Sequence, residues 1–541
     1  MIIIHLHSKS AKITVIPSNT EKFIGFQIDG IRYLDSFKFL TASLDNLVQN
    51  LHNDGLEYFK YTMRTFGDND PIIFQKGVYP YEHMTDRDVF KETNLPPKEA
   101  FYSKLKFEGI SDKEYERAQQ MWNRYACKTL EDYTSLYVKL DTVLLADVFE
   151  NLRRIAFQQY GLDPAHCWTL ASYTWQAALK FTGMQLELIT DPDIFLMFKS
   201  AIRCGISTVS NRLATANNKY IDAYDRSKPT SYIISWDVIN LYGFCMLSKL
   251  PCANFRFLDN PENFHFQSVQ HDSDTGYLLE VDLDYPDELH NSHSDQPLAP
   301  EHFKITPNML SEYSKADSSF HGQVALTPNL YSKTKYVLYL RNLQLYTQEL
   351  KFGRYTGYWH STKRLILHHT FYSTQKNVSR HAQILKKIYI NYLLTACLVK
   401  QSSSYVHAHI RLLSDAALTK LYIRKPTCKS FHIINEDLTM VHLGKRKIHM
   451  NKPIYAGMVI LDIAKTVVYD LHYKYLFKKF SPETCKLLFT DTDSLTYYIE
   501  TGDVYQDILP DAIQHFDCSE YPESHISVSY THLTLPTNRE V

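Results

Sequence analysis

The chain has 541 residues, of which 44% are hydrophobic and 22% are charged, and its formal net charge is −1. This length allows two or more domains with sizeable cores, and the composition is globular rather than disordered. A charge so near zero does not by itself predict a nucleic-acid partner, so a DNA groove would need segregated basic residues. The nine cysteines include no Cys-x-x-Cys pair, so we expect reduced thiols in an intracellular protein. No apolar run approaches the roughly 20 residues of a membrane span.

The first 110 residues combine strands, a helix and loops. Residues 22–29 and 31–34 have the alternation of strands, and residues 44–51 repeat apolar side chains at helical spacing. Asp35 lies between these elements and is interpreted as a helix N-cap. The alternative is a metal ligand, which requires more assumptions. Residues 71–110 are rich in proline and turn-forming residues and predict loops.

A long helix is predicted over residues 129–153, where apolar residues recur at helical spacing. Within it, Tyr137 and Asp141 lie one turn apart and share a face. Such a pair is most often a surface hydrogen bond, so it indicates a site only together with further carboxylates. Polar, turn-forming residues follow over 205–230 and predict a domain boundary there.

Two predicted strands each end at an aspartate. Residues 231–237 form a strand that delivers Asp237 to a turn, and residues 486–499 form a hairpin whose tip carries Asp491 and Asp493. A solvated turn is the ordinary interpretation of a single Asp-Thr-Asp sequence. Two strand ends that both present carboxylates favour a shared cation site, because close carboxylates repel and Mg²⁺ takes hard oxygen ligands. Two metal ions held in this way stabilise an in-line phosphoryl displacement.

The segments around these strands are also regular. Residues 276–286 predict a strand, and residues 330–342 predict a chain that leads into a helix. Residues 429–434 and 438–443 predict paired strands, and a long apolar helix opens at Pro453. We expect that helix to form core behind the Asp-Thr-Asp hairpin.

The two aspartate motifs resemble motifs A and C of family B DNA polymerases, D-x-x-S-L-Y-P and D-T-D-S. Motif A here has Asn240 in place of Ser and Gly243 in place of Pro. That variant is similar to the protein-primed branch, and most similar to polymerases of Maverick/Polinton mobile elements and related viruses. The resemblance covers nearly the whole chain, except residues 348–402 and the tail.

This resemblance implies template-directed DNA synthesis, in which a primer hydroxyl attacks the α-phosphate of a dNTP bound through two Mg²⁺ ions. It implies that Asp237 and Asp493 are the metal ligands and that Asp491 supports the site. Leu241 and Tyr242 would bind the nucleotide, with Tyr242 under the incoming sugar, where it excludes a 2′-hydroxyl. The expected partners are a DNA template and primer, dNTPs and a terminal priming protein, and no membrane.

The same resemblance covers residues 1–204. The pair Tyr137 and Asp141 is similar to the Y-x-x-x-D motif of 3′–5′ proofreading exonucleases, in which the Asp binds metal and the Tyr orients water. Proofreading also needs a D-x-E pair and an N-x-x-x-(Y/F)-D segment, and neither appears in this sequence. We therefore predict an exonuclease remnant without proofreading activity. Arg203 and Gly205 belong to a segment that resembles R-G-G-I-S, which lies between the two domains and contacts template.

The resulting fold prediction is α+β. A truncated, RNase-H-like exonuclease-like domain, residues 1–204, precedes a family B polymerase palm and fingers domain, residues 205–526, and the thumb is missing. Residues 255–345 would be an insertion of the terminal-protein type. The alternative for that stretch is another strand-rich layer of the palm.

Two further stretches depart from the family. Residues 348–402 match nothing in it, although its motif B belongs there. Codons permitted for residues 373–382 and 395–401, read in another frame, allow sequences that resemble the family. We interpret the stretch as a compensated pair of frameshifts, with a diverged fingers insert as the competing interpretation. Codons permitted for residues 528–537 resemble a sequencing-library adapter, so residues 527–541 are left out of the fold prediction.

The function prediction is a DNA-directed DNA polymerase that replicates a mobile element or virus by protein priming. Its alternative is a catalytically dead, nucleic-acid-binding remnant, which would bind DNA in a salt-dependent way without adding dNTPs. A nuclease is disfavoured because the carboxylates that it requires are missing. The first two predictions differ in one observable, the template-directed incorporation of nucleotides.

Overall fold

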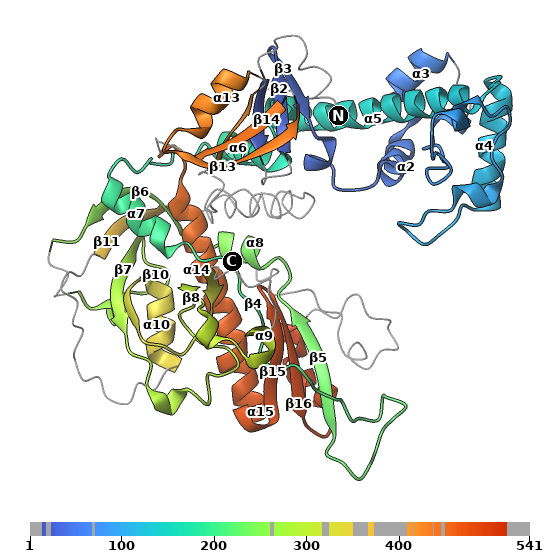
Figure 1. Ribbon diagram of the computed structural model, residues 1–541. Coiled ribbons are helices and arrows are strands. Elements are labelled where there is room, and N and C mark those ends of the chain that lie inside the picture. The colour runs from blue at the N-terminus through green and yellow to red at the C-terminus, as the bar shows by residue number, and fades with distance from the viewer. Residues whose placement is uncertain are drawn as a thin grey trace. The chain divides into compact units, whose positions relative to one another are not determined.

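The computed structural model describes most of the chain. The described residues are 13–17, 23–67, 71–259, 264–315, 324–349, 366–372, 408–413, 415–436, 438–444 and 450–516. The chain forms two compact units, whose elements are labelled in Figure 1. The first unit joins Met1–Met184 to His407–Arg446, and the second joins Gln185–Val406 to Lys447–Val541. The boundary predicted between residues 204 and 205 falls inside the second unit, and the role of each domain stays a prediction.

Two of the predicted segments lie largely outside the described residues. Within 348–402 the structure describes residues 348–349 and the strand β11, Ile366–Tyr372. The frameshift interpretation depends on residues 373–382 and 395–401, which are not among the described residues, and neither is the tail from residue 527. Both the frameshift and the adapter interpretations therefore stay predictions.

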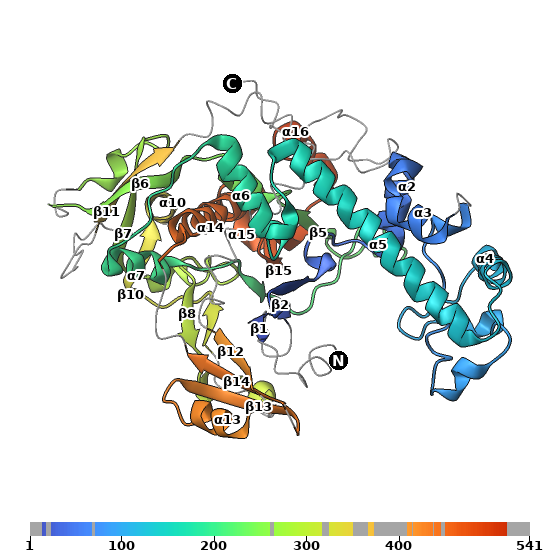
Figure 2. The same cartoon turned by 90° about the horizontal axis from the view of Figure 1, so that it is seen from above.

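The first unit is built on one long helix, α5 (Leu130–Tyr160), which is visible along its length in Figure 2. The helix predicted from residue 129 is confirmed and continues as far as Tyr160, where Gly161 adopts a φ of 61° and ends it. Thr129 caps the N-terminus in a capping box with Asp132. The other α-helices among the described residues of this unit are α2 (Leu44–Asp54), α3 (Lys60–Phe66), α4 (Asp112–Arg124), α6 (Leu170–Thr182) and α13 (Ala416–Ile423).

A buried carboxylate joins α5 to α3. Asp147, on α5, accepts hydrogen bonds from the backbone N–H groups of Tyr61 at 2.8 Å and Thr62 at 2.9 Å, and from Thr62 Oγ1 at 2.8 Å. These are donors of the first turn of α3, which have no partner within the helix. A negative charge at this end of the helix also interacts favourably with the positive end of the helix dipole. Asp147 is therefore fully satisfied without an ion pair, and it fixes where α3 begins.

Two three-stranded sheets complete the first unit. Strands β1 (Ile13–Pro17), β2 (Phe23–Ile28) and β3 (Ile31–Leu34) form an antiparallel meander. The second sheet has the order β12-β14-β13, with β12 at Ala408–Leu413, β13 at Cys428–Asn435 and β14 at Leu438–Gly444. The predicted pairing of β13 with β14 is confirmed, and β1 lies close to β12. Asp35 accepts from Phe37 N at 3.0 Å, which confirms the N-cap interpretation.

The second unit contains the sheet that carries the predicted aspartates. Its order is β4-β15-β16-β5, and each neighbouring pair is antiparallel. The predicted strand and the predicted hairpin are both confirmed. The strands are β4 (Ser207–Val209), β5 (Ser231–Asp237), β15 (Cys485–Asp491) and β16 (Ser494–Glu500).

A second sheet in this unit has the order β10-β7-β11-β6. The predicted strand at residues 276–286 is confirmed as β7, and β11 lies between β7 and β6. The strand β10 leads directly into α10, as the sequence predicts. The strands here are β6 (Leu250–Phe257), β7 (Thr275–Leu283) and β10 (Lys333–Tyr339), and a separate pair is β8 (Glu301–Lys304) with β9 (Val324–Thr327).

The core helix of the second unit is α14 (Ile454–Tyr469), which is buried on nearly every side. It continues through a π-helical turn, Asp470–Leu476, into α15 (Phe477–Thr484), which packs on β15 and β16. The remaining α-helices in the described part of this unit are α7 (Pro192–Ala201), α8 (Leu241–Met246), α9 (Glu312–Lys315), α10 (Leu340–Glu349) and α16 (Val504–His515). Among the described residues, no helix is both long and apolar enough to cross a membrane.

Candidate functional site

The pairing of β16 with β5 brings the predicted aspartates together. The register places Ser494 opposite Asp237, and Val238 N donates a hydrogen bond to Asp493 O at 2.9 Å. Asp491, at the end of β15, lies opposite Ser494 across the hairpin. Three carboxylates from two segments far apart in the sequence therefore share one end of the sheet.

The tip of the hairpin is a strained turn. Thr492 has a φ of 63°, a left-handed conformation that β-branched residues rarely adopt. Within the turn, Asp493 N donates to Asp491 O at 2.7 Å. A second bond comes from outside the hairpin, since Thr492 N donates to Ile206 O at 2.8 Å. Such a conformation persists only where the surroundings hold it, so the position of Asp493 depends on its neighbours.

The electrostatics of the turn favour a cation. Burial, followed by the neighbouring charges of Asp237 and Asp491, raises the pKa of Asp493. Among the described residues there is no cluster of three or more His, Cys, Asp or Glu side chains that could hold a metal ion. Mg²⁺, however, is commonly bound by one or two carboxylates together with substrate phosphates. The donor set of Asp237 and Asp493 therefore fits Mg²⁺ that arrives with a nucleotide.

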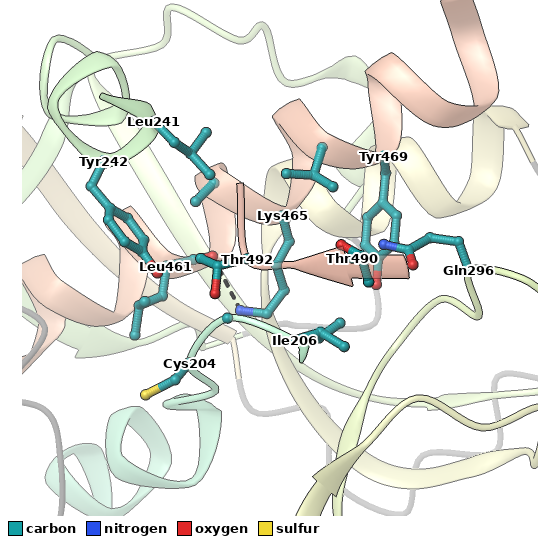
Figure 3. A pocket seen from close by; sticks show the side chains of 13 residues that line it. Cys204, Ile206, Leu241, Tyr242, Gln296, Leu461, Lys465, Tyr469, Thr490 and Thr492 are labelled. Atoms are coloured by element: carbon teal, nitrogen blue, oxygen red, sulfur yellow. Dashed lines mark hydrogen bonds between the residues drawn. The ribbon is translucent and has the colours of Figure 1, made fainter. Parts of the chain in front are cut away.

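A small pocket adjoins the turn and contains both predicted nucleotide-binding residues (Figure 3). Leu241 is buried in its wall, and Tyr242 points into it beside Thr492 and Cys204. Burial, together with the nearby Cys204 and Asp493, raises the pKa of Tyr242 to about 12. The phenol is therefore neutral at pH 7 and can act as an uncharged surface next to the carboxylates.

The predicted template-contact residues, Arg203 and Gly205, lie beside this pocket in different ways. Gly205 lines the pocket at Thr492. Arg203 is buried, its Nη1 donates to Val337 O at 2.7 Å, and its guanidinium lies 3.8 Å from the centre of the Tyr336 ring. The guanidinium therefore faces the interior of the unit, and template contact at this segment stays a prediction. Its exposed Cys204 does not have a positive φ, so a side chain fits there without backbone strain.

Two functional candidates on α14 were missed by the sequence analysis. Lys465 is buried, and its Nζ donates to Arg203 O at 2.7 Å and lies 3.4 Å from Asp462 Oδ1. Asp462 also accepts from Tyr339 N at 2.9 Å. The signal was present in the sequence, because an Asp and a Lys three residues apart interrupt an otherwise apolar helix.

In the first unit, the predicted exonuclease residues lie in a polar cluster with a lysine. Lys76 Nζ is 3.3 Å from Asp141 Oδ2 and donates to Tyr137 Oη at 2.8 Å. Tyr81 Oη also shares a hydrogen bond with Tyr137 Oη at 2.8 Å. Burial, followed by the Tyr81 bond, raises the pKa of Tyr137 well above its usual value. Lys76 was not predicted as part of this cluster, and the absence of proofreading stays a prediction.

Comparisons with known proteins give structural similarity only. A scan against protein-family models finds no match, and a search of curated proteins finds none. The chain is similar to Phi29 DNA polymerase complexed with primer-template DNA, at 14% identity and a TM-score of 0.42, over 92% of this chain and 67% of that one. The ternary complex with incoming nucleotide substrates gives 14% identity, a TM-score of 0.43 and the same coverage. Similarity at this level does not establish activity, so a function has to rest on the residues of the site.

Behind the hairpin, the π-helical turn contacts β16 through a buried histidine. His472 Nδ1 shares a hydrogen bond with Tyr497 Oη at 2.8 Å, and His472 has no exposed surface. Burial, followed by the nearby His293, lowers the pKa of His472 to about 3. The imidazole is therefore neutral in the folded protein.

We expect His472 to make the folded protein sensitive to mild acid. Its pKa in the folded state, about 3, lies below the value near 6.5 of an unfolded histidine. The unfolded chain therefore binds the extra proton between these values, so stability is complete above pH 6.5 and decreases as the pH falls toward 3. The free energy of unfolding is measured by denaturant titration at pH 7.5 and at pH 5. Between these two values it should decrease by about 2 kcal/mol less in His472→Gln than in the wild type. Parallel pH profiles of the two proteins would contradict a neutral buried His472.

Proposed function

We propose that the second unit is the palm of a DNA-directed DNA polymerase, which adds dNTPs to a primer under the direction of a template. One observation carries this proposal. The strands β5 and β16 bring Asp237 and Asp493 to neighbouring positions at one end of a sheet, beside Tyr242 and Asp491. Carboxylates from two separate strands, next to a pocket for an apolar or aromatic group, suit phosphoryl transfer with a bound nucleotide.

Each residue has a defined part in the proposed reaction. Asp237 and Asp493 would hold the metal, and Asp491 adds negative charge beside them. Mg²⁺, when bound, supplies charge stabilisation for the attacking and leaving oxygens of the phosphoryl transfer. Leu241 closes the wall of the pocket, and the neutral Tyr242 offers its ring to the sugar of the incoming nucleotide, where a 2′-hydroxyl would meet it.

The finer parts of the proposal follow from the resemblance of the motifs. We place the chain in the protein-primed branch of family B, in a mobile element of the Maverick/Polinton type or a related virus, with a terminal priming protein as partner. The first unit would be the exonuclease remnant. The ion pair between Lys76 and Asp141 supports the absence of proofreading there, because a lysine ammonium competes with a metal ion for the carboxylate.

Primer extension by the full chain tests the proposal. The substrate is a DNA primer annealed to a template with one defined unpaired base, and the four dNTPs are supplied one at a time with MgCl₂. We expect the complementary nucleotide to be added and EDTA to stop the reaction. Salt-dependent DNA binding without incorporation would instead support the non-catalytic remnant. Incorporation that ignores the template base would exclude a template-directed polymerase.

A further inference from the structure

The segment of residues 203–206, between α7 and β4, supports the Asp-Thr-Asp turn from outside the hairpin. Ile206 O accepts the hydrogen bond from Thr492 N at 2.8 Å, and Gly205 packs against the Thr492 side chain. Figure 3 shows Cys204 and Ile206 on either side of this contact, below Thr492. We infer that the 203–206 segment positions the turn for catalysis, with Gly205 and Thr492 as a matched pair of positioning residues. This inference rests on the proposed polymerase function.

The fit between Gly205 and Thr492 leaves no room for a side chain. A Cβ added at Gly205 would lie 2.5 Å from Thr492 Cγ2 and 2.7 Å from Thr492 Cβ, closer than real Cβ atoms approach other atoms. Because Thr492 Cβ is attached to the backbone, relieving the clash requires the backbone of the turn or of the 203–206 segment to move. Gly205 does not have a positive φ, so the close approach, and not the backbone conformation, requires glycine here.

The turn needs such support because of its own conformation. Thr492 is β-branched and left-handed, and each of these properties raises the energy of the turn. Its N–H points away from the hairpin to Ile206 O. Without that acceptor the tip would keep the bond from Asp493 N to Asp491 O and the bond from Val238 N to Asp493 O. A shift of the turn moves Asp493 directly, since Asp493 follows Thr492.

The 203–206 segment is itself anchored at two places in the core. Arg203 Nη1 bonds to Val337 O on β10 at 2.7 Å, and Lys465 Nζ on α14 bonds to Arg203 O at 2.7 Å. Asp462 ties these anchors together, because it pairs with Lys465 and accepts from Tyr339 N of β10. The path to the turn therefore starts from buried, hydrogen-bonded groups on α14 and β10 and ends at the half-buried Thr492 and Asp493.

The steric part of the inference is tested by a substitution and its compensation. Gly205→Ala should lower the rate of nucleotide incorporation roughly a hundredfold, the typical cost of a misplacement near 1 Å. Thr492→Gly removes the three atoms nearest to the new Cβ, which all belong to the Thr492 side chain, and glycine suits a φ of 63°. Gly205→Ala combined with Thr492→Gly should therefore return to within about tenfold of the wild type. If the double variant incorporates nucleotides no faster than Gly205→Ala, the proposal that Gly205 and Thr492 form a matched pair is wrong.

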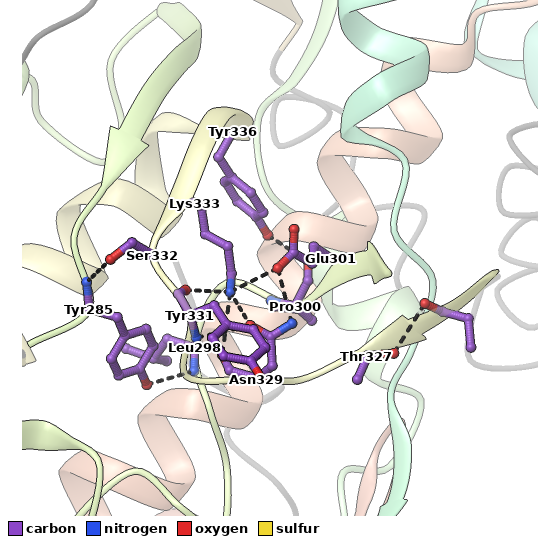
Figure 4. A network of polar contacts seen from close by, with 11 residues as sticks. Tyr285, Leu298, Pro300, Glu301, Thr327, Asn329, Tyr331, Ser332, Lys333 and Tyr336 are labelled. Atoms are coloured by element: carbon purple, nitrogen blue, oxygen red, sulfur yellow. Dashed lines mark hydrogen bonds and ion pairs between the residues drawn. The ribbon is translucent and has the colours of Figure 1, made fainter. Parts of the chain in front are cut away.

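Hydrogen–deuterium exchange tests the support independently of activity. The amide of Thr492 should exchange faster in Gly205→Ala and in Lys465→Met than in the wild type. The matched control is Lys333→Met, which also removes a buried lysine. Lys333 Nζ pairs with Glu301 at 3.1 Å and donates to Tyr331 O at 2.6 Å, and neither of these partners belongs to the 203–206 segment (Figure 4).

The outcomes distinguish this inference from the proposed function. If the Thr492 amide exchanges at the wild-type rate in both Gly205→Ala and Lys465→Met, the 203–206 segment does not support the turn. This holds even if the wild-type protein is an active polymerase. Equal acceleration by Lys333→Met also overturns the inference, because a general loss of stability would then explain the effect. Exchange at Thr492 could instead be accelerated in Gly205→Ala and Lys465→Met alone while the wild type adds no nucleotide. That result would support the contact and contradict the polymerase function. If Lys465→Met does not fold, Gly205→Ala still decides the question.

Discussion

Replacing Asp493 with Asn is expected to lower nucleotide incorporation on the order of a thousandfold, the upper range for removal of one group that stabilises the transition state. Asn keeps the shape of the side chain but removes the charge, so the candidate site retains a single ligand, Asp237. The measurement is single-nucleotide primer extension at saturating Mg²⁺, with DNA affinity measured alongside. DNA affinity should persist, because the substitution touches no basic residue. Incorporation at the wild-type rate would show that the metal-ligand assignment is wrong.

The matched control for this substitution is Asp503→Asn. Asp503 pairs with Lys219 at 2.6 Å and follows the end of β16 opposite to Asp493, so its loss should leave incorporation unchanged. Thermal unfolding adds a second readout. Because burial and two neighbouring carboxylates disfavour the ionised Asp493, Asp493→Asn should unfold at a higher temperature than the wild type in EDTA. Mg²⁺ should then stabilise the wild type and not the variant.

The second large effect is on stability. Asp462→Ala is expected to cost about 3–5 kcal/mol, because it leaves Lys465 as a buried charge without its carboxylate. It also leaves Tyr339 N without its acceptor in the core. The measurement is the free energy of unfolding from denaturant titration. The double variant Asp462→Asn with Lys465→Met should lose less unfolding free energy than Asp462→Ala, because it removes both charges together.

An exposed pair with the same spacing gives the control for that prediction. Glu312 and Lys315 are also three residues apart on a helix and approach to 2.6 Å, but the Glu312 side chain is 91% exposed. Glu312→Ala should change the unfolding free energy by less than about 1 kcal/mol, as is usual for surface ion pairs. Equal losses from Asp462→Ala and Glu312→Ala would contradict the role of burial in the Lys465 pair.

Local patterns predicted the strands that carry the candidate aspartates. Strands were predicted up to Asp237 and on both sides of the Asp491–Asp493 turn, and these strands are present in the structure. Their proximity also followed, because two strand ends with like charges suggested a shared cation. The pairing of β16 with β5 was not itself predictable, since alternation defines a strand but not its neighbour.

The missed residues are those whose role depends on distant contacts. Lys76 belongs to a loop, and its ion pair with Asp141 joins positions that no local periodicity relates. Lys465 bonds to Arg203 O in the same way, through an approach that only the folded unit creates. Residues 408–444 show a related limit. The strands β13 and β14 were predicted, but as part of the polymerase domain, whereas the structure adds β12 and assigns the segment to the first unit.

That assignment has a consequence for the order of events during synthesis. The ribosome makes β1 early, but β12, which lies close to β1, follows more than half of the chain later. The first unit therefore cannot complete its fold while residues 185–349 of the other unit are being synthesised. The second unit is also incomplete at that stage, because β5 pairs with β16, which follows β12 in the chain. Pairings at such long range form slowly and leave strand edges open to aggregation, so the first unit should depend on chaperones until β12 is made, and the second until β16 is made.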